Sequence, residues 1–302
     1  MNIKYIPFQE IDKVKWNSCI HYAVNSEVSG YYWWLKAVVK EWDAIVEGDY
    51  ESVLPVFKRR DLWGRNSIYQ PQLVDKIGIQ STHLLSRKRI VKMLELLPEY
   101  HSVQMKFNEM NIIPPDFEGT AITKKAYRIL LNKTHQTLRE AYGMTAQALL
   151  MKPMSDDYYF QMMMKPEDIV NFAKSQNQLP YDEHQTLRVF YNLLHRGTLV
   201  STVIQNRNRD VIAMMVFTYH LKKVKVLLSC QSEEGKAINA VYRLYDHVFN
   251  LHQQKPLMFE FFQTDAEVAK ELGAEEYSYW EINQFDLLGK WSERLEKISL
   301  FN

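Results

Sequence analysis

The segment Lys225 to Asn250 constrains the fold more than any other part of the sequence. An apolar run at Val226 to Leu228 predicts a buried β-strand, and the stretch Ser229 to Lys236 then interrupts it with polar residues and a glycine. Apolar residues return at helical spacing, at Ile238, Val241, Leu244, Tyr245 and Val248. The pattern therefore predicts a buried strand that leads through a polar turn directly into an amphipathic helix.

The turn in this segment has the composition of an anion cradle. A helix start exposes backbone N–H groups, and Gly235 and Ala237 keep side-chain bulk away from them. Lys236 adds a positive charge, while Ser232 and Asn239 add polar side chains that either bond a phosphate or cap the helix. We expect a site for phosphate or pyrophosphate here, although most turns of this spacing only connect a strand to a helix.

Composition excludes several classes of protein. The 302 residues, 46% of them hydrophobic, suffice for one large domain or two smaller ones, and a net charge of +1 gives no general attraction to nucleic acid. Cys19 and Cys230 stand far apart without metal-ligand spacing, so we expect neither a disulfide framework nor a metal site. Without a signal peptide or a long apolar run, the sequence predicts no membrane span and a cytoplasmic location.

The order of predicted elements is similar in the two halves of the chain. A hairpin, a third strand, a helix and a further strand follow one another in each half, which predicts an α/β protein with mixed sheets. Two prolines and a glycine in Ile113 to Gly119 suit a linker. We therefore expect an N-terminal domain over residues 1–115 and a C-terminal domain over residues 120–302.

Several short motifs give the chain a resemblance to a known group. They are Trp33-Trp34-Leu35, Trp42-Asp43-Ala44-Ile45-Val46, Gly48-Asp49-Tyr50, Val53-Leu54-Pro55, Tyr69-Gln70-Pro71, Ile77-Gly78-Ile79-Gln80-Ser81, Phe259-Glu260-Phe261 and Leu272-Gly273-Ala274. With these motifs the chain resembles the FemABX type of tandem acyltransferase, within the GNAT superfamily, and particularly its short Bacteroidetes members. The resemblance implies two GNAT-like domains in tandem, of which the second binds the acyl donor.

The sequence departs from the group at three places. Thr145 to Leu150 stands where relatives that handle large substrates carry a basic segment, and Phe262-Gln263 replaces an acidic-glycine pair. Ser232 stands at the first position of the GNAT pyrophosphate motif, where the group has Gln or Arg. These departures weaken a transfer of cell-wall chemistry to this chain and leave the identity of the donor open.

The resemblance also indicates which residues would act in acyl transfer. Splayed central strands would hold the donor carbonyl, with the pantetheine arm of a CoA pairing with Val226, Leu228 and Ser229. Glu260 and Tyr219 are the polar groups that we expect nearest the reacting amine. The alternatives are that Glu260 lies on the polar face of a strand and that Tyr219 only packs its ring.

These observations lead to one expected function and two alternatives. The expected function is an N-acyltransferase that moves an acyl group from acyl-CoA to an amine on a small molecule or peptide. The first alternative is an aminoacyl-tRNA-dependent transferase of the FemABX type, which the near-neutral charge does not favour. The second is a degenerate pair of GNAT-like domains that binds a ligand without catalysis.

Overall fold

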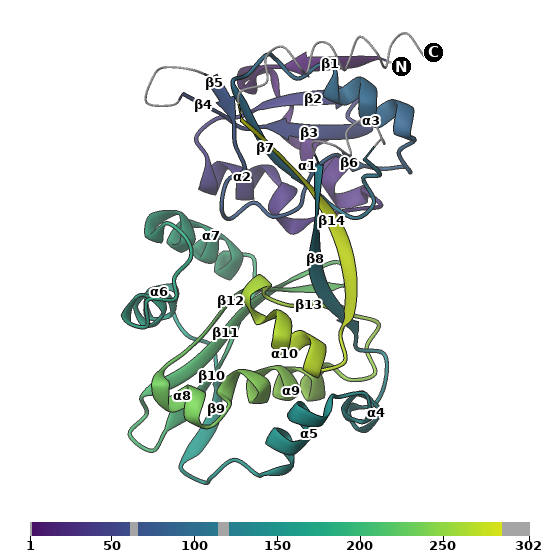
Figure 1. The fold of residues 1–302 in the computed structure, drawn as a ribbon. Helices are drawn as coiled ribbons and strands as arrows, with labels where there is room; N and C mark the ends of the chain where they lie inside the picture. The colour runs from purple at the N-terminus through teal and green to yellow at the C-terminus, as the bar shows by residue number, and fades with distance from the viewer. Residues whose placement is uncertain (1, 61–65, 114–120, 286–302) are drawn as a thin grey trace. The chain divides into compact units, whose positions relative to one another are not determined.

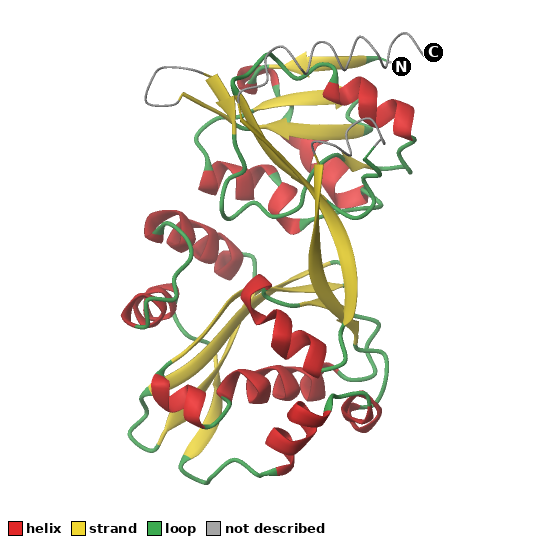
Figure 2. Ribbon diagram, in the orientation of Figure 1, coloured by secondary structure: helices red, strands yellow, loops and turns green. Residues whose placement is uncertain are grey.

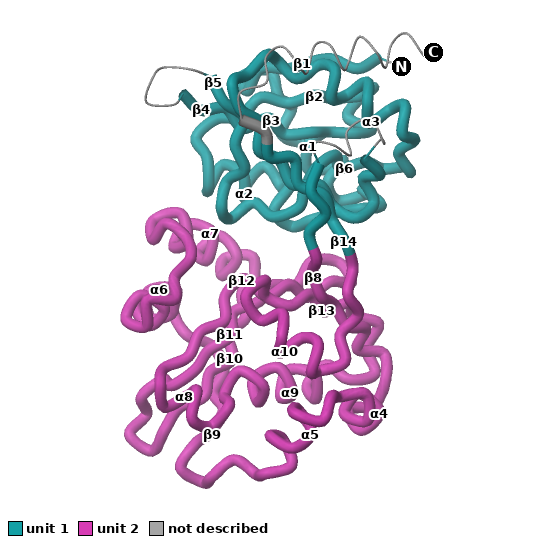
Figure 3. Tube along the Cα trace, viewed as in Figure 1, with its two compact units in different colours: residues 1–124, 278–302 teal, residues 125–277 magenta. Residues whose placement is uncertain are grey.

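The computed structural model describes residues 2–60, 66–113 and 121–285. The chain divides into two compact units: unit 1 comprises Met1–Lys124 and Ser278–Asn302, and unit 2 comprises Lys125–Tyr277 (Figure 3). The end of the chain belongs to unit 1 because β14 (Glu275–Phe285) pairs with β7 (Ser102–Phe107) there. Apart from Ile113, the predicted linker Ile113 to Gly119 lies outside the described residues.

Unit 1 contains two groups of strands. Strands β1, β2, β3 and β6 form an antiparallel sheet in that order, and β4, β5, β7 and β14 follow one another in a second sheet. The remaining bounds are β1 Ile3–Ile6, β2 Asp43–Glu47, β3 Ser52–Val56, β4 Lys58–Arg60, β5 Asn66–Ile68, β6 Gln80–Ser81, α1 Lys13–Tyr22, α2 Tyr32–Val38 and α3 Arg87–Leu94.

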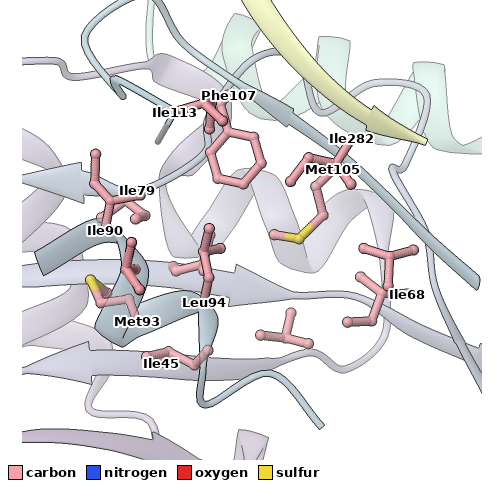
Figure 4. Packing of buried hydrophobic residues seen from close by; sticks show 14 residues of the cluster. Ile45, Ile68, Ile79, Ile90, Met93, Leu94, Met105, Phe107, Ile113 and Ile282 are labelled. Carbon is pink, nitrogen blue, oxygen red and sulfur yellow. The ribbon is translucent and has the colours of Figure 1, made fainter. Parts of the chain in front are cut away.

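The core of unit 1 lies between its strands and α3. Ile90, Met93 and Leu94 are buried on one face of α3, as their spacing in the sequence predicts. They pack in one cluster with Met105 and Phe107 of β7 (Figure 4). This packing holds α3 against β7, and the helix also contacts β2.

Unit 2 is built on one sheet, whose described strands run in the order β8, β13, β12, β11, β10 and β9 (Figure 1). Its elements are β8 Ala121–Leu130, α4 His135–Glu140, α5 Met144–Met151, β9 Tyr158–Met162, α6 Pro166–Ser175, α7 Glu183–His195, β10 Leu199–Asn206, β11 Val211–His220, β12 Lys223–Gln231, α8 Glu233–Ala237, α9 Ala240–His252, β13 Met258–Glu260 and α10 Ala266–Glu271. Both β8 and β14 have residues in each unit.

Aromatic packing joins α9 to the sheet of unit 2. The ring of Phe259 on β13 meets the rings of Tyr245 and Phe249 on α9 at 5.9 and 5.2 Å, and the ring of Phe217 on β11 at 6.5 Å. All four side chains are fully buried. Helix α9 contacts β10, β11 and β12, and Figure 2 shows it beside these strands. These contacts define one face of the sheet, which we call the α9 face.

The two units repeat one order of elements, as predicted. A hairpin, a third strand, a helix and a further strand occur in each: β2, β3, β6, α3 and β7 in unit 1, and β10, β11, β12, α9 and β13 in unit 2. Strands β4 and β5 stand between β3 and β6, and α8 stands between β12 and α9. The fold is therefore α/β with mixed sheets, and each unit contains one copy of this order of elements. Among the described residues, none of the helices has the length and apolar character that crossing a membrane requires.

The polar turn predicted at Ser229 to Lys236, before the long helix, is wrong in its extent. Strand β12 continues through Ser229 to Gln231, and the long helix begins only after the short helix α8. Asn239 separates α8 from α9 in the left-handed conformation, with φ +56°. Polar residues continue the strand because β11 still pairs with it up to Ala213 opposite Gln231.

Candidate active site

The two central strands of unit 2 part from each other. Strands β12 and β13 pair in parallel only from Lys223 opposite Met258 to Lys225 opposite Glu260, where β13 ends. Strand β12 continues to Gln231, and beyond Lys225 its only partner strand among the described residues is β11. The result is an open strand edge, which we call the β12 edge.

A β-bulge lies where the strands part. Val216 on β11 pairs with Leu228, and the next residue Phe217 pairs with Val226, so Leu227 is an extra residue in β12. Bulges redirect a strand and end its pairing with a neighbour. The bulge therefore supplies a local reason for the parting of β12 from β13.

The direction of the backbone along the β12 edge follows from one hydrogen bond. The N–H of Ser232 donates to the carbonyl of Ile212 at 2.8 Å, toward β11. Successive residues of a strand point their backbone groups to opposite sides, so Gln231 points its N–H and C=O away from β11. Ser229, two residues earlier, does the same. Of the predicted donor-binding residues, Ser229 thus has its backbone on the β12 edge.

A row of polar side chains crosses the sheet at the end of β13. Thr218, Lys225, Glu260 and Arg128 are direct partners on four neighbouring strands. Nζ of Lys225 lies 3.7 Å from Oε2 of Glu260, and their side chains are 12% and 5% exposed. Arg128 in turn forms an ion pair with Glu275 at 3.4 Å. We call these four residues the polar row.

The polar row lies on the sheet face away from α9. Phe259 belongs to the α9 face, and side chains alternate along a strand, so Glu260 points to the other face. A carboxylate buried among cations keeps its charge at a lower desolvation cost than an isolated one. Glu260 is thus an ionisable group held beside the point where the β12 edge begins.

Tyr219, the second predicted catalytic residue, lies on the α9 face. Its hydroxyl is 2.5 Å from Nε2 of His252 at the end of α9. Nδ1 of His252 donates to the carbonyl of Val248 at 2.8 Å, so Nε2 accepts the proton of Tyr219. Burial lowers the pKa of His252 and raises that of Tyr219. The structure therefore separates Tyr219 from Glu260 on opposite faces of the sheet.

A half-buried carboxyl group that the sequence reasoning missed, that of Asp265, lies near the ends of both strands. Asp265 accepts a hydrogen bond from Tyr245 at 2.7 Å, and the same hydroxyl accepts one from the N–H of Phe262 at 3.3 Å. Burial raises the pKa of Asp265, although the hydroxyls of Tyr245, Ser229 and Thr264 oppose this effect. An aspartate directly before a helix usually caps it. The side chain of Asp265 stands directly before α10 but makes no capping hydrogen bond to it.

The predicted anion cradle fits a pyrophosphate poorly. The N–H of Gln231 donates to Gln178, that of Ser232 to Ile212, and that of Gly235 to the hydroxyl of Ser232. These donors are therefore already in use. Glu233 and Glu234 add two carboxylates to the first turn of α8, where an anion would have to bind.

The other predicted cradle residues have local roles. A Cβ atom on Gly235 would lie 2.4 Å from the carbonyl oxygen of Ile212, so the glycine permits close packing against β11. Nζ of Lys236 pairs with Glu233 at 2.6 Å. Ala237 ends α8, and the side chain of Asn239 does not cap α9. Within the described residues, no group of acidic, histidine or cysteine side chains has the arrangement of a metal site.

Comparisons with known proteins bear on the fold. No protein-family model and no curated protein matches the sequence. A solved structure of FemX is similar over 94% of this chain and 98% of that chain, with a TM-score of 0.65 at 7% identity. A conserved protein of unknown function from Bacteroides thetaiotaomicron is similar over 92% and 100%, with a TM-score of 0.53 at 12% identity.

A tandem GNAT protein from the clavulanic acid biosynthesis pathway is also similar, over 93% of this chain and 98% of that chain, with a TM-score of 0.49 at 11% identity. At such identities a structural likeness concerns the fold and leaves the chemistry to the site. The chain therefore has a FemX-like fold.

Proposed function

We propose that this protein is an N-acyltransferase and that its reaction takes place where β12 parts from β13 in unit 2. The observation that carries the proposal is the juxtaposition of an open strand edge with a buried carboxylate, since pairing of the two strands ends at Glu260 itself. Acyl transfer requires donors for the acyl oxygen and a base for the amine. The β12 edge and Glu260 supply these two kinds of group.

In this proposal the residues have separate roles. The outward N–H of Ser229 is a hydrogen-bond donor for the acyl oxygen, on which negative charge develops during attack. Glu260 accepts a proton from the ammonium of the acceptor, so that the neutral amine can attack, and Lys225 orients the carboxylate from 3.7 Å. We assign the proton for the leaving group to Asp265, because its carboxyl group lies near the ends of both strands, within 2.7 Å of the Tyr245 hydroxyl. The acceptor is an amine on a small molecule or a peptide.

Two classes of donor are consistent with an acyltransferase-like fold. Acyl-CoA follows from the sequence resemblance and is the donor to test first. The carboxylates of Glu233 and Glu234 at the start of α8 favour the second class, an aminoacyl ester such as aminoacyl-tRNA, because that class needs no pyrophosphate at this turn. The acceptor amine and the role of Glu260 are the same for both.

The test is acyl transfer by wild type and by Glu260→Gln. Purified protein is incubated with acetyl-CoA or aminoacyl-tRNA and a set of amines and short peptides, and products are detected by mass spectrometry. We expect Glu260→Gln to lower kcat by about 100-fold, the scale of general-base catalysis.

The matched control is Glu276→Gln, which alters a more exposed carboxylate, with a side chain 41% exposed, on β14, the strand beyond β8 in the sheet order. This variant should retain turnover. Equal turnover of Glu260→Gln and wild type would remove Glu260 from the mechanism. The absence of transfer from both donors to every amine would favour a binding protein instead.

A further inference from the structure

Gln178 holds the far end of the β12 edge. Its Nε2 donates to the carbonyl of Gln231 at 2.9 Å, and its Oε1 accepts from the N–H of Gln231 at 2.9 Å. The side-chain amide thus occupies both backbone groups that Gln231 directs away from β11. This is the same pair of hydrogen bonds that a neighbouring strand or the amide of an extended ligand would form.

The loop between α6 and α7 is built to present Gln178. After α6, Asn177 adopts the left-handed conformation with φ +54°, and its N–H donates to Lys174 at 2.9 Å. The N–H of Gln178 donates to Ala173 at 2.8 Å. These two bonds form a Schellman motif, which fixes the backbone at the residue that carries the amide. The position of the Gln178 side chain beside Gln231 is therefore fixed by the backbone conformation of residues 177 and 178.

Ser229 is the other outward-facing residue of the β12 edge. Among the described residues, no side-chain amide bonds to its backbone in the way that Gln178 bonds to Gln231. The open part of the edge therefore lies nearest the polar row, and the closed part lies toward α8. A donor that extends along the β12 edge beyond Ser229, as far as Gln231, must compete with Gln178 for the backbone groups of Gln231.

We infer that Gln178 is a specificity-determining residue, which disfavours acyl donors whose arm carries amide groups along the β12 edge. The inference rests on the proposed function, because it concerns the donor of the proposed transfer. A pantetheine arm carries two amides and must displace Gln178 to pair at Gln231. An aminoacyl ester has no amide arm on its leaving group and does not meet this competition. Gln178 thus shifts the choice of donor toward acyl esters.

The experiment compares donor binding by wild type, Gln178→Ala and the control Gln176→Ala. Gln176 lies on the same helix end, but its side chain contacts Ser175 and not β12. Acetyl-CoA and pantetheine are titrated calorimetrically into each protein. We expect Gln178→Ala to bind both about tenfold more tightly, the scale of losing one or two competing hydrogen bonds, and Gln176→Ala to match wild type.

Pantetheine separates the two parts of the donor site. It lacks the nucleotide, so an equal gain for pantetheine and acetyl-CoA assigns the effect to the β12 edge. Equal affinities of wild type and Gln178→Ala would overturn the inference, and so would weaker binding by Gln178→Ala. Failure of every variant to bind either probe would also overturn it, since Gln178 would then not be what limits binding.

Amide hydrogen exchange of Gln231 provides a second readout. The N–H of Gln231 should be protected in wild type, exchange faster in Gln178→Ala, and become protected again when acetyl-CoA is added to that variant. Continued protection in Gln178→Ala alone would contradict the inference. These outcomes do not depend on turnover, so the acyl transfer proposal is decided separately by Glu260→Gln.

Discussion

The strands that precede the long helix differ in the two units, although their backbones are alike. In unit 1 the N–H of Thr82 donates to Glu51 at 3.0 Å, toward β3, just as Ser232 donates to Ile212 in unit 2. Ser81 and Ile79 therefore point their backbone groups away from β3, in the way that Gln231 and Ser229 point theirs away from β11.

Unit 1 closes both of these positions with buried amides. Asn111 accepts from the N–H of Ile79 at 2.8 Å and donates to its carbonyl at 3.0 Å. Asn25 accepts from the N–H of Ser81 at 3.0 Å, and the N–H of Val24 donates to the Ser81 carbonyl at 2.8 Å. All of the outward backbone groups at these two residues are thus bonded within unit 1.

Unit 2 closes only one of its two positions. Gln178 comes from the connection between α6 and α7, as Asn25 comes from the connection between α1 and α2, and each bonds to the last residue of the strand. No counterpart of Asn111 bonds to Ser229 among the described residues. A few amide side chains thus decide whether the edge of this strand is closed, as in unit 1, or partly open, as in unit 2. The proposed donor site therefore belongs to unit 2.

The largest expected effect comes from opening the sealed edge. Asn111 is fully buried, so Asn111→Ala leaves the N–H of Ile79 unpaired, while the Ile79 carbonyl keeps its bond from Asn25 at 2.7 Å. The loss of this buried amide should destabilise unit 1 by about 3 kcal/mol. Gln178→Ala should cost less than about 1 kcal/mol, because Gln178 is half-buried and water can replace it. A larger stability loss for Asn111→Ala than for Gln178→Ala would show that the Asn111 amide is part of the folded core, whereas a ligand can displace the Gln178 amide.

Tryptophan fluorescence measures this difference for one unit alone. None of the seven tryptophans lies within residues 125–277, so the fluorescence reports on unit 1. In urea, Asn111→Ala should lower the fluorescence midpoint and Gln178→Ala should leave it unchanged. An unchanged midpoint for Asn111→Ala would mean that the amide is not needed to close the edge.

The sequence predicts the repeated order of elements but not the edges. Apolar periodicity identifies α9 and the buried strand Val226 to Leu228, since burial of these side chains depends on local spacing. The extent of β12 could not be predicted, because polar Ser229 and Gln231 remain in the strand only through pairing with β11. Pairing of this kind depends on residues far away in the chain.

The candidate site shows the same limit. Glu260 could be selected because the family resemblance places its strand beside Val226 to Ser229, although its alternation with Phe259 and Phe261 suits a polar strand face equally well. Its partners Lys225 and Arg128 come from other strands and become neighbours only through the register of the sheet. Gln178 and Asp265 have no motif around them. Their roles depend on where a helix end and a strand end meet, which no local pattern encodes.

A second comparison concerns how each long helix is anchored. In unit 1, Arg89 of α3 donates to the buried carboxylate of Glu47 at 2.8 Å. In unit 2, the carboxylate is on α9 itself: Asp246 accepts from Arg139 and His135 at 2.9 and 2.8 Å. Burial acts to raise the pKa of Asp246, but the hydrogen bonds from Arg139 and His135 outweigh it and lower the pKa.

Asp246→Asn should therefore destabilise unit 2 by about 2 kcal/mol at pH 7, because it removes the charge that His135 and Arg139 neutralise. The side chain of Asp246 is 10% exposed, but that of Arg139 is 44% exposed, so solvent screening keeps the loss below that of a fully buried pair. A carboxylate with a lowered folded-state pKa stabilises above its unfolded-state pKa, and this contribution is lost as the pH falls through the folded-state value. The gap between variant and wild type should shrink in acid. Thermal unfolding followed by circular dichroism at pH 7 and pH 3 measures the gap.

Tryptophan fluorescence again separates the units in this experiment. The fluorescence transition of Asp246→Asn should match that of wild type, since Asp246 lies in unit 2. A gap that stays constant between pH 7 and pH 3 would show that the ionised carboxylate is not the source of the stabilisation.

The smallest expected effect concerns Tyr219. Tyr219→Phe keeps the ring contact with Phe217 but removes the hydrogen bond to His252, which should cost about 1 kcal/mol. Turnover should stay within about twofold of wild type, because the hydroxyl is engaged on the α9 face while Glu260 lies on the other. The measurement is kcat beside that of Glu260→Gln. A loss of turnover near that of Glu260→Gln, without a change in stability, would instead place both faces of the sheet in the active site, since Tyr219 would then act on the reaction rather than on the packing of α9.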